Sequence, residues 1–186
     1  EEACEAVSAI FRAGIVPSAL EFMERDAIDW VLKFVDGLNV QVSDAIQAHL
    51  LIEVDGNYPD ILFQEAEKIM NVVEQFQIDE VLFADTEDQK NALWKMRRSV
   101  AEAVKANSIY KEEDTVVPRY ELPKLLHGIK TIGNKYGFKS VCYGHAGDGN
   151  LHVNIIKGDM TDANWNTEVT KGIREIFELT VSLKGT

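Results

Sequence analysis

The sequence predicts an α+β fold in which an antiparallel sheet carries helices packed on one face. Segments with helical periodicity alternate with short β-like segments along the chain. Two strand–helix–strand units are expected, at residues 48–84 and 115–145, and a hairpin partner follows the second unit directly. Strands that mix crossover helices with hairpins favour a ferredoxin-like, duplicated arrangement, although the two halves share no clear sequence repeat.

Each element is predicted from its local pattern. Apolar residues at three- and four-residue steps predict helices, whereas short apolar or alternating runs bounded by turn residues predict strands. The predicted helices cover residues 2–12, 26–35, 60–76, 88–105 and 121–136, and a final helix begins at 162. The predicted strands cover residues 15–22, 48–54, 79–84, 115–118, 139–145 and 150–156. Pro118 places its strand at a sheet edge or a strand end, because proline cannot donate to a ladder.

The length, composition and charge of the sequence predict one globular domain, residues 1–186, and argue against a nucleic-acid partner. A chain of 186 residues can bury a proper core. Its formal net charge of −12, with no basic cluster, argues against nucleic acid, because like charges repel. Cys4 and Cys142 form no CxxC pair, so we expect reduced thiols in a cytoplasmic protein, with a single disulfide left open. The sequence shows no signal peptide and no membrane-spanning apolar run.

Both ends of the sequence predict a piece of a longer polypeptide. The first residues already read as helix, without the usual capping residue and without an initiator Met. The last residues, Gly185-Thr186, follow what reads as the C-terminal turn of a helix. We therefore expect further domains and ligands outside residues 1–186.

The most informative segment is the decapeptide Tyr143-Gly-His-Ala-Gly-Asp-Gly-Asn-Leu-His152. Asp-Gly between alternating apolar residues is a strong hairpin signal. If Asp148 and Gly149 are the two central turn residues, His145 stands directly opposite His152. Directly opposed side chains lie about 4.5–5.5 Å apart on one face, which lets two imidazoles share one metal ion.

Other interpretations of this hairpin remain open at the level of the sequence. Asn154 falls on the same face as His152, because strand side chains alternate. If Gly149-Asn150 formed the turn instead, His145 would face Asn154 and the argument for paired ligands would weaken. The histidines could also be structural, bonded only to their neighbours. His49 and His127 have no comparable partner in the sequence.

This segment resembles the signature of the C-terminal domain of FAD-linked oxidases, the flavoenzymes related to D-lactate dehydrogenases, the glycolate oxidase flavin subunit and D-2-hydroxyglutarate dehydrogenase. The resemblance covers nearly the whole chain. Further segments resemble the family's pattern in the family's order: Ala13-Gly-Ile-Val-Pro-Ser-Ala-Leu-Glu-Phe-Met, Leu50-Leu-Ile-Glu-Val-Asp-Gly, Leu93-Trp-Lys-Met-Arg-Arg and Glu113-Asp-Thr-Val-Val-Pro-Arg-Tyr-Glu-Leu-Pro.

The resemblance implies a metal site that is only partly contained in this sequence. Family members carry an FAD-binding domain before this one and a Gly-Glu-His-Gly segment after it, and neither is present in residues 1–186. By match to the motif, His145 and His152 are implied to be catalytic through a divalent metal such as Zn or Mn, which they bind. The third protein ligand would be the glutamate of the Gly-Glu-His-Gly segment.

The resemblance also implies substrate-binding residues. Arg97 matches the position whose guanidinium grips the substrate carboxylate, a task suited to its bidentate fork. Lys111 matches a basic residue on the substrate side, with a surface lysine as the competing interpretation, and Asn154 matches a polar residue beside the metal. Members often carry Thr where this chain has Ala101, which puts the detailed pocket in doubt. The acidic run 112–114 reads as a solvated turn.

The function implied is that of the cap domain of an FAD-dependent oxidoreductase that oxidises a small 2-hydroxy acid such as D-lactate, glycolate or 2-hydroxyglutarate. Its partners would be that substrate, the absent FAD-binding domain and an electron acceptor, and a homodimer is left open. The metal would polarise the substrate hydroxyl, a nearby histidine would take its proton, and flavin N5 would accept the hydride. Residues 1–186 alone should be inactive. The alternatives are a noncatalytic ferredoxin-like binding module and an independent metallohydrolase.

Overall fold

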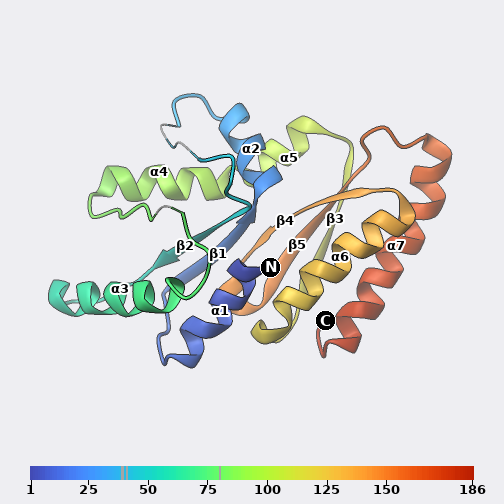
Figure 1. The fold of residues 1–186 in the computed structure, drawn as a ribbon. Helices are drawn as coiled ribbons and strands as arrows, with labels where there is room; N and C mark the ends of the chain where they lie inside the picture. Colours follow the sequence, from blue (N-terminus) through green and yellow to red (C-terminus); the bar gives the residue numbers. More distant parts are fainter. Residues whose placement is uncertain (39, 41, 80) are drawn as a thin grey trace.

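A five-stranded antiparallel sheet forms the centre of the computed structural model, which describes residues 1–38, 40, 42–79 and 81–186 (Figure 1). The strands are β1 (Ala19–Glu24), β2 (Ala48–Glu53), β3 (Tyr110–Val116), β4 (Lys139–Gly144) and β5 (Asn150–Ile156). Their order in the sheet is β2-β1-β4-β5-β3. The predicted α+β class and antiparallel sheet are therefore confirmed.

The helices lie close to the predicted positions. They are α1 (Glu2–Arg12), α2 (Arg25–Phe34), α3 (Pro59–Val73), α4 (Glu87–Arg98), α5 (Val100–Asn107), α6 (Leu122–Tyr136) and α7 (Asp162–Ser182). One helix was predicted over 88–105, but the structure divides it at Ser99. The hydroxyl of Ser99 donates to the carbonyl of Lys95, a back-bond that bends helices.

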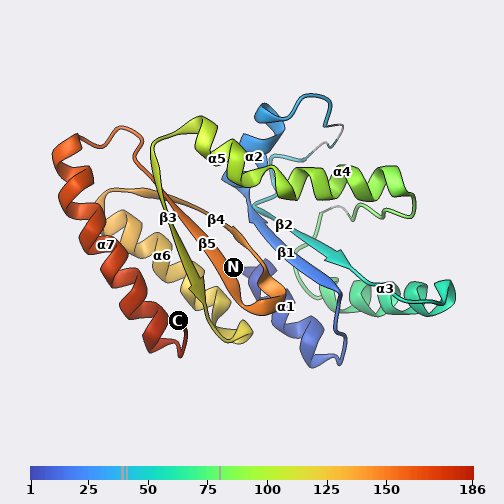
Figure 2. The same cartoon turned by 180° about the vertical axis from the view of Figure 1, so that it is seen from behind.

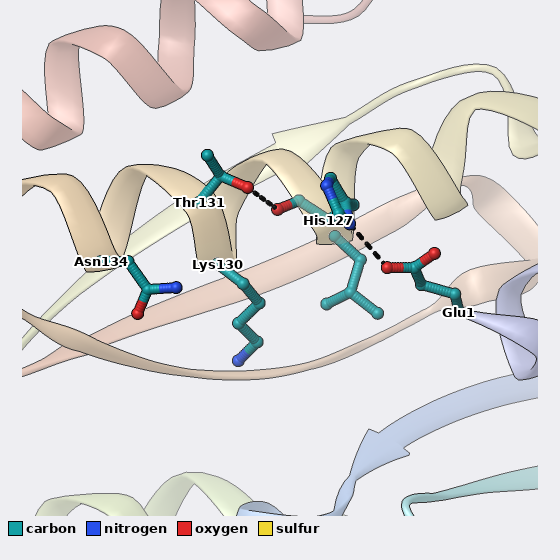
Figure 3. A pocket seen from close by; sticks show the side chains of 6 residues that line it. Glu1, His127, Lys130, Thr131 and Asn134 are labelled. Carbon is teal, nitrogen blue, oxygen red and sulfur yellow. Dashed lines mark hydrogen bonds and ion pairs between the residues drawn. The ribbon is translucent and has the colours of Figure 1, made fainter.

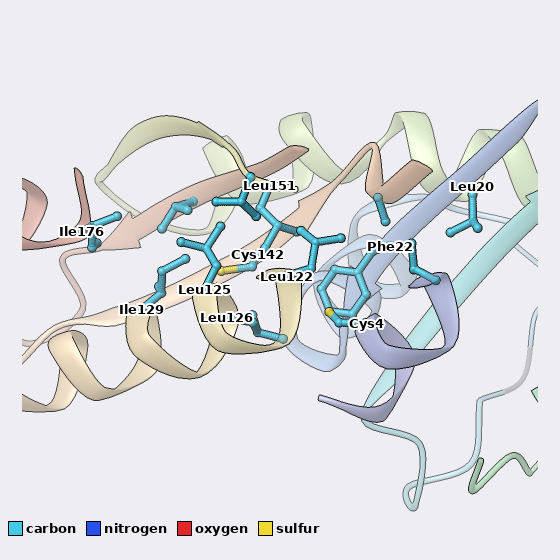
Figure 4. Packing of buried hydrophobic residues seen from close by; sticks show 14 of the residues in the cluster. Cys4, Leu20, Phe22, Leu122, Leu125, Leu126, Ile129, Cys142, Leu151 and Ile176 are labelled. Atoms are coloured by element: carbon cyan, nitrogen blue, oxygen red, sulfur yellow. The ribbon is translucent and has the colours of Figure 1, made fainter. Parts of the chain in front are cut away.

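One face of the sheet packs against α1, α6 and α7 (Figure 4). Phe22, Cys142 and Leu151 point from the strands toward apolar side chains such as Leu125 and Ile129 of α6. All five side chains are fully or almost fully buried. This cluster is the larger of the two in the domain and gives the sheet a continuous apolar support.

The opposite face carries a second apolar cluster, so the prediction of helices on one face only is wrong. Met23, Val141 and Tyr143 pack against α2 and α5. They neighbour Phe22 and Cys142 in sequence, and successive strand residues point to opposite faces. The strands are apolar in both sets of alternate positions, which requires cover on both faces. In Figure 2, β3, β4 and β5 lie in front, and α2 and α5 meet toward one end of this second face.

The arrangement of the strands only partly resembles the predicted ferredoxin-like plan. β3 and β4 are connected by α6 and both pair antiparallel with β5, which lies between them. This is a split strand–helix–strand unit, as in ferredoxin-like folds. The first half differs, because β1 and β2 pair directly with each other. The described residues therefore show no duplication of the unit.

The predicted strand at residues 79–84 is also wrong for the residues that the structure describes; residue 80 lies outside them. Residues 81–84 form no ladder, and the side chains of Val81, Leu82 and Phe83 are exposed. The ring of Phe83 stacks on Phe63 of α3 at a centroid distance of 6.1 Å. Phe83 of this apolar run thus packs on α3, and residues 81–84 pair with no strand.

Several smaller expectations can be compared directly with the structure. β3 lies at a sheet edge, as Pro118 predicted, but begins at Tyr110 rather than at residue 115. Its Val116 exchanges two backbone hydrogen bonds with Thr186. Cys4 and Cys142 are free thiols, and burial raises the pKa of each to about 12. Within the described ranges, every helix is too short or too polar to cross a membrane.

Substitutions at two neighbouring residues of β1 test whether helices cover both faces. Phe22 and Met23 are each 1% exposed and point to opposite faces. We expect Phe22→Ala to lower the free energy of unfolding by about 3–5 kcal/mol and Met23→Ala by about 2–5 kcal/mol, because each leaves a cavity. Urea denaturation measures both. Val16→Ala, at a side chain 78% exposed, is the control. A free energy of unfolding that is unchanged in Met23→Ala would contradict the packing of a second apolar cluster on this face.

Candidate functional site

The histidine hairpin has a different register from the predicted one. β4 pairs with β5 so that Tyr143, not His145, stands opposite His152, and Val141 stands opposite Asn154. Neither of the two registers considered from the sequence is present. Residues 146–149 form a helical turn instead of a two-residue turn, and the amide of Asn150 donates to the carbonyl of His145. Gly149 closes this turn with φ +78°.

The two imidazoles nevertheless lie side by side. Their ring centroids are 5.7 Å apart in an edge-to-face arrangement, and the ring of Tyr143 lies 5.2 Å from that of His152. Two imidazoles that share one ion through nitrogens at about 2.1 Å have centroids on the order of 5–6 Å apart. The spacing therefore fits a shared metal ion, although the hairpin register that brings the two rings together is not the predicted one.

Each histidine has a carboxylate at its Nδ1 atom. His145 Nδ1 lies 2.8 Å from Oε1 of Glu21, and His152 Nδ1 lies 3.1 Å from Oδ1 of Asp114. The His145 contact has hydrogen-bond geometry, and a carboxylate accepts, so the proton of this neutral ring belongs on Nδ1 and its lone pair on Nε2. The His152 contact is an ion-pair distance without hydrogen-bond geometry, and it favours the same tautomer. Metal-binding histidines commonly have such a partner on the other ring nitrogen. The donor set therefore fits a divalent ion held through both Nε2 atoms.

Arg97 lies beside the histidines at the C-terminal end of α4. Its Nε donates to Oε2 of Glu21 at 2.8 Å, and its Nη2 lies 2.7 Å from the same oxygen. The two side chains are almost fully buried. The guanidinium lies 5.2 Å from the ring centroid of Tyr143. Nη2 is itself buried, and its contact with Oε2 is an ion pair without hydrogen-bond geometry.

Asn154 completes the buried polar part of this face. Its Nδ2 donates to the carbonyl of Val141 at 3.4 Å, while its Oδ1 is buried without a hydrogen-bond partner among the described residues. Burial also raises the pKa of the neighbouring Tyr143 phenol, which keeps it neutral at physiological pH. The structure thus brings together four of the five predicted site residues: Arg97, His145, His152 and Asn154.

Lys111 does not join them. It stands opposite Ile155 in the β3–β5 ladder, and its Nζ lies 5.5 Å from the ring centroid of Trp165 in α7. Because strand side chains alternate, Lys111 faces the α7 side of the sheet. Glu112 and Asp114 are the β3 residues on the histidine face, opposite Asn154 and His152. The acidic run 112–114 is therefore part of a strand, not the predicted turn.

Glu21, Asp114 and Tyr143 are site residues that the sequence analysis missed. Glu21 carried a signal, because a lone carboxylate in the apolar run Leu20 to Met23 needs a buried partner. Asp114 did not, since acidic residues near a loop are common on any surface. Asp114 is also tied to the hairpin by Nδ2 of Asn150, at 2.7 Å from its Oδ1.

A second polar group lies on the opposite side of the sheet, on α6 (Figure 3). There His127 Nδ1 lies 2.7 Å from Oε1 of Glu1. Lys130 donates to Glu24 and to the carbonyl of Ser140, so its charge is already paired. Over residues 1–38, 40, 42–79 and 81–186, no group of three or more His, Cys, Asp or Glu side chains could hold a metal.

Comparison with known proteins assigns the domain to a class of flavoenzymes. The chain belongs to the FAD-linked oxidases, because the family profile for their C-terminal domain matches residues 1–186. It is 33% identical over 189 residues to the glycolate oxidase subunit GlcD of Bacillus subtilis and 31% identical over 182 residues to the D-lactate dehydrogenase of Anaerostipes hadrus. These alignments cover 100% and 95% of this chain but only 39% and 38% of the relatives.

Two further comparisons are more distant. The mitochondrial D-2-hydroxyglutarate dehydrogenase of Arabidopsis thaliana is 29% identical over 155 residues, which are 80% of this chain and 27% of that protein. Among solved structures, the 4-ethylphenol oxidase from Gulosibacter chungangensis matches with a TM-score of 0.57 at 13% identity, over 96% of this chain and 41% of that one. The latter likeness shows a shared fold.

Two glycines test the turn that carries His145. Gly149 and Gly137 have nearly equal positive φ angles, +78° and +77°. A Cβ on Gly149 would lie 1.9 Å from the carbonyl oxygen of Val117, whereas a Cβ on Gly137 would meet nothing within 4 Å. We expect Gly137→Ala to cost about 1–2 kcal/mol of unfolding free energy, from backbone strain alone.

Gly149→Ala should cost at least about 1–3 kcal/mol more than Gly137→Ala, because the β3 end must move to admit the methyl group. Urea denaturation of both variants gives the difference. Equal losses of unfolding free energy in the two variants would contradict close packing of the turn on Val117.

Proposed function

We propose that this domain binds the substrate and a divalent metal in an FAD-dependent oxidoreductase that oxidises a small 2-hydroxy acid. The observation that carries the proposal is the histidine pair, in which both Nδ1 atoms lie against carboxylates and neither Nε2 atom has a hydrogen-bond partner among the described residues. The names of the relatives support the substrate class, because lactate, glycolate and 2-hydroxyglutarate are all 2-hydroxy acids.

The bound groups supply the chemistry that the side chains lack: a divalent ion is a Lewis acid toward the substrate hydroxyl, and FAD takes up two electrons. Oxidation of the alcohol to a 2-oxo acid removes a hydride from Cα and a proton from the hydroxyl. The proposed enzyme would also need an electron acceptor to which the flavin passes these electrons. The FAD-binding domain of the proposed enzyme would lie outside residues 1–186.

The side chains of this domain would hold the ion and orient the substrate. His145 and His152 would hold the ion through Nε2. Arg97 would orient the substrate carboxylate through its guanidinium, and Asn154 would offer its Oδ1, which has no hydrogen-bond partner among the described residues. With Nδ1 of each ring against a carboxylate and Nε2 given to the ion, neither histidine would be available as the base. The base must be another group, and Lys111 has no part in this proposal.

A histidine substitution in the full-length enzyme tests the proposal. We expect His152→Ala to lower metal content and kcat together, each by at least about 10-fold, because loss of a ligand should exceed the loss of a supporting contact. Metal content is measured by elemental analysis and kcat with D-lactate, glycolate and D-2-hydroxyglutarate in turn.

His127→Ala is the matched control, since His127 is exposed on α6 across the sheet from the site. It should leave metal content and kcat unchanged. Metal content and kcat that survive in His152→Ala would contradict the proposal. A wild-type protein without metal dependence would favour the noncatalytic binding module.

A further inference from the structure

We propose that Glu21 is the positioning residue of this site, which sets the ring of His145 and the guanidinium of Arg97 relative to each other. This inference rests on the proposed function for the roles of those two residues. Glu21 itself needs contact with neither substrate nor metal. Its side chain is 5% exposed and lies beneath both partners on β1.

The two oxygens of Glu21 serve two different donors. Oε1 lies 2.8 Å from His145 Nδ1, and Oε2 accepts from Arg97 Nε at 2.8 Å. Both partners donate, so the bridge requires a group with two acceptors and no donor. Among buried side chains only a carboxylate meets this requirement, because an amide of the same shape presents one acceptor and one donor.

The first contact determines which nitrogen of His145 faces the hairpin. With the proton held on Nδ1 by Glu21, the lone pair lies on Nε2, and the ring stands edge-to-face with that of His152 at a centroid distance of 5.7 Å. Partners of this kind fix the tautomer and the ring orientation of metal ligands. His145 is half exposed and follows the end of β4, so packing alone does not hold its ring.

The second contact holds Arg97 at the same carboxylate. Glu21 offsets the buried charge through Nε and through the ion pair of Nη2 with Oε2 at 2.7 Å. Arg97 is 7% exposed and stacks beside Tyr143, so its position is set from two sides. The same carboxylate therefore determines the distance between a metal ligand and the group that would bind the substrate carboxylate.

Glu24 provides a matched comparison on the same strand. It is also buried, at 8% exposed, and pairs with Lys130 of α6 at 2.7 Å. The two glutamates are three residues apart, so they point to opposite faces of the sheet. A purely structural role for Glu21, as one more buried ion pair, predicts the same consequences at both positions. A positioning role predicts consequences for the metal at Glu21 alone.

The experiment uses the full-length enzyme with Glu21→Gln. Zn²⁺ affinity is measured by chelator competition without substrate, and the imidazole ¹⁵N shifts of labelled histidine report the tautomer of His145. We expect Zn²⁺ affinity to fall by about 10- to 100-fold and the Nδ1–H signature of His145 to be lost. Glu24→Gln should change neither quantity.

Glu21→Gln removes the negative charge that offsets buried Arg97. If this variant does not fold, the double variant Glu21→Leu, Arg97→Met replaces it. Apolar residues of similar volume commonly preserve folding at a buried ion pair. The double variant still removes the acceptor from His145, so the same loss of Zn²⁺ affinity is expected. Its control is Glu24→Leu, Lys130→Met.

The outcomes separate this inference from the proposed function. If the wild-type enzyme binds Zn²⁺ and the Glu21 variants bind it equally well, Glu21 does not position the site, while the proposed function stands. If the wild-type enzyme binds no Zn²⁺, the proposed metal role fails. In that case the imidazole ¹⁵N signature of His145 alone tests whether Glu21 positions its ring. A signature unchanged in the Glu21 variants overturns the inference.

Discussion

The bridge from Glu21 to Arg97 and His145 is the interaction on which the geometry of the site depends. It joins β1 to side chains 76 and 124 residues away, at the end of α4 and just after β4. A buried ion pair adds little stability unless its geometry is good and its remaining atoms are bonded. Here both oxygens of the carboxylate have a donor. The bridge therefore restrains the relative positions of three elements that the sequence separates widely.

The cover on the two faces of the sheet explains where this bridge can meet a ligand. One face is packed by α1, α6 and α7, whereas α2 and α5 pack over part of the other (Figures 1 and 2). On this second face the side chain of His145 is half exposed and that of His152 is partly exposed. Glu112 and Asp114 are exposed on this face, and the charge of Arg97 is already offset. Such a surface attracts a cation more strongly than an anion. A bound divalent ion would reverse this balance in favour of a carboxylate substrate.

Much of the fold could be predicted from the sequence, because helical periodicity and buried strands are local patterns. Pro118 predicted a sheet edge or a strand end, and β3 lies at an edge of the sheet and ends before Pro118. The one-face arrangement failed because strands apolar on both faces require cover on both, a property of packing that extends beyond each segment. The histidines were found by motif, but their register was not, since Asp148-Gly149 closes a helical turn here. The position of Glu21 in an apolar run indicated a buried partner, but His145 and Arg97 as its partners emerged only from the structure, because they are distant in sequence.

His145 and His152 are proposed to hold one divalent ion through Nε2 while carboxylates lie at their Nδ1 atoms. X-ray absorption spectroscopy of the Zn²⁺-loaded full-length enzyme tests this coordination most directly, together with the same measurement on His145→Ala. We expect two imidazole nitrogens at about 2.0–2.1 Å from the ion in the wild type and one fewer in the variant. A coordination shell of oxygen alone, or one unchanged by the substitution, would contradict it.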